Sequence, residues 1–85
     1  MIKIYKDIIK KYIKNITIED IKKFSSKYNE VLTNEEALII LNYIKTYHNE
    51  LLNKDTSSFI ILKQNLRNDL FNKIVLLYNE YNKYI

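Results

Sequence analysis

Apolar residues recur every three or four positions along most of the chain, which is the spacing of one face of an α-helix. This periodicity predicts a first helix over residues 2–14 and a second from Thr17 to a stop at Asn29. A third helix is predicted from Thr33 to about Leu52. No segment shows sustained alternation of apolar and polar residues, so we predict no strands. The pattern indicates an all-α fold.

Two of these predicted helices begin with recognisable capping signals. Thr17 is followed three residues later by Asp20, and Thr33 is followed at the same spacing by Glu36. A Thr at the N-cap and an acidic side chain three residues on can each satisfy a backbone N–H of the first helical turn. Leu32 stands at the position of a hydrophobic staple before the second cap. Both helix starts are therefore expected close to these residues.

The last third of the chain allows either one long helix or two. A polar linker, residues 53–57, precedes it, and no Pro or Gly interrupts it. On one continuous helix, the apolar residues before Asn65 and those after Asp69 would face different sides. This favours a break between Asn65 and Asp69, with Asn68 as the N-cap of the last helix. We therefore predict a compact bundle of four or five short helices with short connections, forming a single helical domain over residues 1–85.

Composition removes several classes of function. The chain has 85 residues and contains no Gly, Pro, Cys or Trp. Without Gly it has no Gly-rich phosphate loop, and without Cys it has no disulfide, thiol nucleophile or Cys-based zinc site. The longest apolar runs are far shorter than the roughly 20 residues of a membrane span. We expect a cytoplasmic protein without a membrane span, whose stability comes from packing.

The residues that most resemble catalytic groups have simpler structural interpretations. His48, the single His, falls within an apolar helical face, and no neighbouring residue is placed to form a metal or acid–base site with it. Glu35 and Glu36 are adjacent at a predicted helix N-terminus, where carboxylates serve as caps and favour the helix dipole. We predict no enzyme activity, no cofactor, no metal and no small-molecule ligand.

Charge is distributed unevenly, although the formal net charge is only +4. Residues 1–28 carry eight Lys and three acids, whereas residues 29–55 carry two Lys and five acids. Several Lys on one helical face suit contact with phosphates, so nucleic acid is a candidate partner. A solvated face in a chain generally rich in Ile, Lys and Asn explains the same residues without a function. The candidate nucleic-acid face consists of Lys3, Lys6, Lys10, Lys14, Lys22 and Lys23.

The chain also holds more large apolar side chains than one stripe per helix requires. The segment after Thr33 is apolar on more than one side, so that helix is either central in the fold or exposes a contact surface. We predict a non-catalytic protein–protein interaction module that binds another protein or itself as a homodimer, with accessory nucleic-acid binding as the alternative. The candidate protein interface consists of Leu38, Ile39, Tyr43, Val75 and Tyr78.

A family resemblance covers nearly the whole chain. The pattern is an Asn-hydrophobic-Thr cap at residues 15–17, a Leu-Thr pair at residues 32–33, Ala37 in the third helix, and an aromatic-bearing last segment from Phe71 to Tyr81. In these positions the chain resembles the YqfT-like family of short uncharacterised proteins of low-GC Gram-positive bacteria. It departs from that family in lacking a Gly after the third helix and a Ser-Pro before the last. The resemblance implies an all-helical fold and no assigned activity.

Overall fold

The computed structural model describes the backbone of residues 2–82 and the side chains of residues 7–80. Within this part the chain forms five helices and no strand, which confirms the all-α prediction. The break in the last third is present, so the bundle has five helices rather than four. The helices are α1 (Ile2–Asn15), α2 (Ile18–Ser26), α3 (Asn34–Leu52), α4 (Phe59–Asn65) and α5 (Asn68–Asn82).

Both predicted capping boxes are formed. The Thr17 hydroxyl accepts from the Asp20 N–H at 3.3 Å, and the Asp20 carboxylate accepts from the Thr17 N–H at 3.0 Å. The Thr33 hydroxyl accepts from the Glu36 N–H at 3.0 Å, and the Glu36 carboxylate accepts from the Thr33 N–H, also at 3.0 Å. Each box satisfies two backbone donors, and this fixes the starts of α2 and α3 where the sequence predicts them.

The end of α2 differs from its prediction by one turn. The helix stops at Ser26, and a turn continues to Asn29, which has a left-handed φ of 62°. Asn tolerates this conformation better than most residues, so Asn29 ends the turn rather than the helix. The Glu30 N–H then donates back to the Ser25 carbonyl at 3.1 Å, which directs the chain toward the start of α3.

The break between α4 and α5 lies at Leu66 and Arg67. Leu66 has extended backbone angles, and its side chain is buried. The Arg67 carbonyl accepts from the Phe71 N–H at 3.0 Å, which is the first bond of α5. Asn68 is therefore the first helical residue, and its predicted role as N-cap is wrong by one position. The position of the break places Leu66 in the core.

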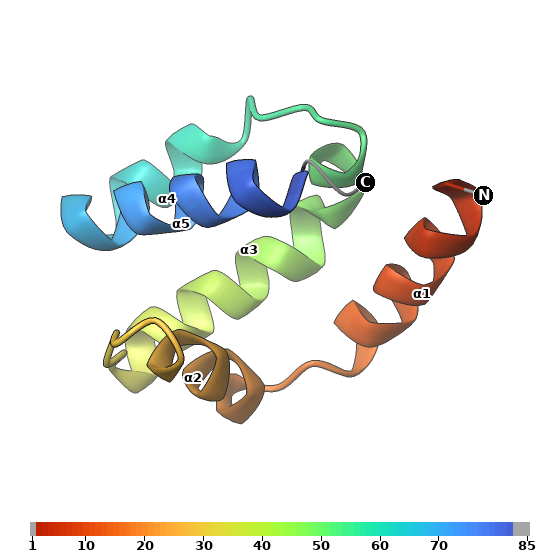
Figure 1. Cartoon of the computed structure of the whole chain (residues 1–85). Helices are drawn as coiled ribbons and strands as arrows, with labels where there is room; N and C mark the ends of the chain where they lie inside the picture. Colours follow the sequence, from red (N-terminus) through yellow and green to blue (C-terminus); the bar gives the residue numbers. More distant parts are fainter. Residues whose placement is uncertain (1, 83–85) are drawn as a thin grey trace.

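Helix α3 lies at the centre of the bundle. In Figure 1 it runs between α1 and α2 on one side and α4 and α5 on the other. Its backbone packs against α1, α2 and α4, and α5 packs against α4. This arrangement explains why α3 is apolar on more than one side. The main cluster of buried residues consists of Ile21, Leu32, Ala37, Tyr43, Leu62, Leu66 and Leu70.

Tyr43 belongs to this core, which corrects its predicted place on an exposed interface. Only 6% of the residue is exposed, because α3 is covered on two sides and a side chain off its main stripe still meets other elements. Its hydroxyl lies 2.7 Å from the hydroxyl of Ser58, which is equally buried. The Tyr47 ring packs against it with centroids 5.2 Å apart. Tyr43 is thus a packing residue with a satisfied polar end.

Candidate functional site: an apolar groove along α3

A groove of about 460 Å³ follows α3 between the two sides of the bundle. The floor is formed from α3 by Ile40, Tyr43, Ile44 and Leu51. One wall comes from α1 and α2, including Ile9, Tyr12, Ile13, Ile21 and Phe24. The other comes from α4 and α5, including Phe59, Leu70, Ile74, Leu77 and Tyr78. The lining is almost entirely apolar, and the volume lies within the range of typical binding sites.

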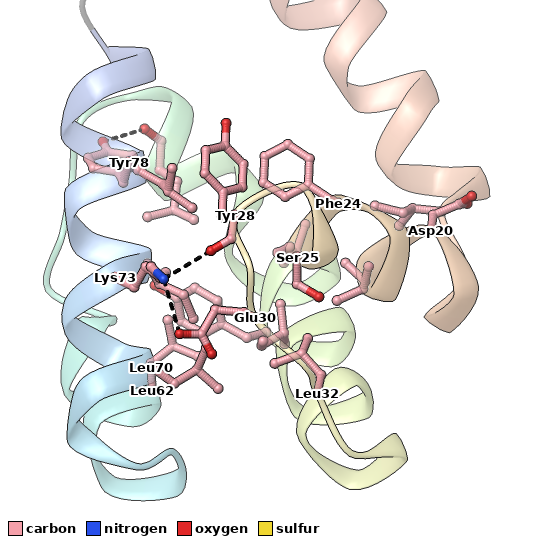
Figure 2. A pocket seen from close by; sticks show the side chains of 18 of the residues that line it. Asp20, Phe24, Ser25, Tyr28, Glu30, Leu32, Leu62, Leu70, Lys73 and Tyr78 are labelled. Atoms are coloured by element: carbon pink, nitrogen blue, oxygen red, sulfur yellow. Dashed lines mark hydrogen bonds and ion pairs between the residues drawn. The ribbon is translucent and has the colours of Figure 1, made fainter.

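The groove is open because α1 and α5, which lie on its opposite sides, do not meet within the described residues. Among the described residues, α1 packs against α3 alone and makes no backbone contact with α5. Figure 2 shows the resulting space, with α5 on one side, α1 on the other and the α2 end between them. Tyr12 on α1 is therefore 62% exposed although it faces the groove, and Phe24 on α2 is 45% exposed. Large apolar side chains at a concave surface are typical of interaction sites.

Aromatic rings form much of both walls. Phe24 and Tyr28 pack with centroids 5.3 Å apart, at the α2 side. On the opposite side the Phe59 ring meets the Tyr78 ring edge-on at 5.4 Å. The Tyr78 hydroxyl donates to the Leu51 carbonyl at 2.8 Å, which fixes the ring over the floor. Burial raises the pKa of Tyr78, and the nearby charge of Asp55 adds to this.

A lysine of α5 connects one wall of the groove to the segment between α2 and α3. Lys73 of α5 donates to the Tyr28 carbonyl at 3.0 Å and to the Glu30 carboxylate at 3.2 Å (Figure 2). Both partners belong to the segment between α2 and α3. Both partners lie more than 40 residues before Lys73 in the chain, so local spacing could not have identified them. The ion pair limits how far α5 and this segment can separate.

The single Arg of the chain holds three carboxylates beside this lysine. The Arg67 guanidinium donates to Glu36 at 3.0 Å, to Asp69 at 3.1 Å and to Glu30 at 3.3 Å. These contacts connect the start of α5 to the start of α3 and to the segment before it. Sequence reasoning missed this cluster because Arg67 lies about 30 residues or more from two of its partners. Arg67 is therefore already engaged within the fold.

Glu36 takes part in both the capping box and the arginine cluster. One carboxylate oxygen accepts from the Thr33 N–H, and the other accepts from Arg67. The backbone hydrogen bond from Thr33, followed by the interaction with Arg67, lowers the pKa of this carboxyl. Its neighbour Glu35 is exposed. Glu36 therefore acts as a helix cap, as the sequence predicts, and the carboxylates of Glu35 and Glu36 do not form a paired acid–base site.

The predicted nucleic-acid face is divided by the structure. The side chains of Lys3 and Lys6 lie outside the described residues. Lys10 and Lys14 line a second hollow between α1 and α3, together with Ile13, Lys45 and His48. Lys22 donates to the side chain of Asn34, and Lys23 is exposed on α2.

The predicted protein interface is likewise not one surface. Tyr78 lines the groove wall, and Tyr43 is buried in the floor. Ile39 packs against the core cluster, while Leu38 is exposed and Val75 is half-buried, and none of these three lines the groove. The sequence signal that could have located the groove walls is the presence of Tyr12 and Phe24, two large aromatic residues on the apolar faces of the first two helices.

Two further properties concern the described part of the chain as a whole. Its residues include no group of three or more His, Asp or Glu side chains that could hold a metal ion. Across residues 2–82, no helix has both the length and the hydropathy that a membrane crossing requires.

The chain matches one family of known sequences, described as a protein of unknown function, DUF2624, over residues 1–81. The chain belongs to the DUF2624 family. The predicted resemblance to an uncharacterised family of small proteins is confirmed at this level, whereas the YqfT-like name and its bacterial range stay predictions. Comparison with curated proteins and with solved structures gives no match.

Proposed function

We propose that this DUF2624 member is a non-catalytic interaction module whose groove binds an amphipathic helix of another protein. The observation that carries the proposal is the apolar groove of about 460 Å³ between α1–α2 and α5. A groove with an apolar floor and two helical walls suits side chains spaced at i, i+3, i+4 and i+7 on a partner helix. The exposed rings at its edge then become covered.

The charge of the walls favours one kind of partner. Residues 1–28, which include the α1–α2 wall, carry eight Lys and three acids. The acids Glu30, Glu36 and Asp69 are already paired with Arg67 or Lys73. A partner with net negative charge is attracted to this wall, whereas a second copy of the chain brings a like charge against it. A heterologous acidic helix therefore fits better than a homodimer.

The test uses two labelled 18-residue model peptides of equal apolar content. Both carry Leu at helical spacing, and their polar positions are Glu in one and Lys in the other. Fluorescence anisotropy with the full chain is expected to show binding of the acidic peptide and at least tenfold weaker binding of the basic one. Sedimentation of the chain alone measures self-association over the same concentrations.

Two matched pairs of substitutions locate the binding surface. Tyr12→Ala with Phe24→Ala removes exposed rings of the groove, and loss of each is expected to cost about 1–2 kcal/mol of binding. Ile60→Ala with Leu76→Ala removes side chains that are also exposed but do not line the groove. Circular dichroism confirms that all variants remain helical. The proposal is wrong if neither peptide binds, or if the two pairs of substitutions weaken peptide binding equally. It is also wrong if the chain alone forms a dimer that is dissociated by Tyr12→Ala with Phe24→Ala and not by Ile60→Ala with Leu76→Ala.

A further inference from the structure

The second hollow, between α1 and α3, has a volume of about 410 Å³ and a different chemical character from the groove. Lys10, Ile13 and Lys14 line it from α1, and Lys45 and His48 line it from α3. Lys10 and Lys14 are one helical turn apart on α1, and Lys45 and His48 are about one turn apart on α3. These two pairs face each other because α1 packs directly on α3. Four of its five lining residues carry basic nitrogen atoms.

The three lysines of this hollow form no ion pair with the described side chains of the protein. Within the described side chains, every ion pair involves Arg67 or Lys73. Asp7, one turn before Lys10 on α1, is exposed and neither lines the hollow nor forms an ion pair there. Three ammonium groups at one concave place repel one another, and an anion between them relieves that repulsion.

General lysine richness does not explain this arrangement. Lys45 is one of only two Lys in residues 29–55, and it lies at the place where α1 brings Lys10 and Lys14. His48 is held by its Nδ1 atom, which lies 3.1 Å from the Lys45 carbonyl oxygen. The other ring nitrogen, Nε2, is thereby left to contact a ligand.

We propose that this hollow binds backbone phosphates of a nucleic acid, without reading its sequence. Lys is a compact point charge suited to phosphate, whereas specific recognition of carboxylates or guanine favours the forked guanidinium of Arg. The only Arg is engaged by three carboxylates, and no Phe, Tyr or Trp ring lines the hollow to stack a base. The surface differs from the face expected from sequence, because α3 supplies Lys45 and His48 in place of the lysines of α2.

The experiment is a titration of a labelled 20-nucleotide single strand and duplex with the full chain, followed by fluorescence anisotropy at several salt concentrations. Three phosphate contacts predict an affinity that falls roughly 20-fold for the single strand and 40-fold for the duplex between about 50 and 200 mM salt. The combined substitution of Lys10→Gln, Lys14→Gln and Lys45→Gln is expected to remove most of this dependence. Two unrelated base sequences are expected to bind equally.

A matched variant separates the hollow from total charge. The combined substitution of Lys27→Gln, Lys54→Gln and Lys63→Gln removes the same charge from exposed positions outside the hollow, and it is expected to retain at least half of the wild-type affinity. Equal losses in the two variants overturn the proposal, as does the absence of binding at low salt. Binding of inorganic phosphate alone, without oligonucleotide binding, also overturns it. The Tyr12→Ala and Phe24→Ala pair is expected to leave nucleic-acid binding unchanged, which keeps this test independent of the groove.

Discussion

The hydrogen bond between the Tyr43 and Ser58 hydroxyls offers a direct test of the core. Both residues are about 6% exposed, and the two oxygens are 2.7 Å apart. Tyr43→Phe or Ser58→Ala leaves the remaining hydroxyl buried without this partner, which costs roughly 1–2 kcal/mol of the free energy of unfolding. The double variant removes both hydroxyls together and is expected to cost less than the sum of the single variants. The coupling energy should be about 1 kcal/mol.

Urea unfolding followed by circular dichroism measures this cycle. For a domain of 85 residues, a loss of about 1.5 kcal/mol corresponds to a fall in Tm of roughly 8 °C, which gives an independent thermal readout. Ser57→Ala, at the exposed neighbouring position, is the control and is expected to change stability little. Additive losses in the double variant would contradict this prediction, because they would mean that the two hydroxyls do not interact in solution.

Three other perturbations test separate parts of the fold. Burial is the main cause that raises the pKa of Tyr43, and it also raises that of Tyr78. Folding therefore favours the neutral form of both phenols. The resulting contribution to the free energy of unfolding is fully present below pH 10 and is lost as the pH rises toward the pKa values of the folded state. Urea unfolding from about pH 8 to about pH 11 should show the decline, and Tyr43→Phe should reduce its slope, so an unchanged slope would contradict this explanation. Leu62→Ala empties a site that is only 1% exposed and should cost about 2–5 kcal/mol in chemical denaturation, whereas a cost below about 1 kcal/mol would mean that the site collapses or is not central. Arg67→Lys loses the forked contacts to three carboxylates and should lower the Tm by several degrees at low salt and by less at high salt. A shift that salt does not change would argue against the ionic cluster.

Features governed by local interactions could be predicted from the sequence. Thr17 and Thr33 fix helix starts through partners only three residues away, so the signal and the structure lie in the same short segment. The change of apolar phase before Asp69 located the break between α4 and α5 for a similar reason. The predicted Asn68 cap was wrong by one position, because the Arg67 carbonyl accepts the first backbone hydrogen bond of α5.

Features that depend on packing between distant segments could not be predicted. The burial of Tyr43 requires knowing that α3 is covered on both sides, and periodicity within one helix does not contain that information. The partners of Lys73 likewise lie more than 40 residues earlier in the chain. The candidate sites are affected most, since the groove and the basic hollow are each formed by residues from helices whose mutual angle no sequence pattern specifies.

Within the described residues α1 packs against α3 alone, and this also divides that part of the protein into units of different local stability. Detaching α1 breaks a single helix–helix interface, while the capping boxes, the Arg67 contacts and the packing around Leu62 all remain. Amide hydrogens of α1 should consequently exchange with solvent through a partial opening, at lower free energy than those near Leu62, which require global unfolding. A ligand that bridges α1 to another helix closes this route. Amide exchange in α1 is therefore an intrinsic reporter of binding, and it needs neither a label nor an assumption about the identity of the ligand.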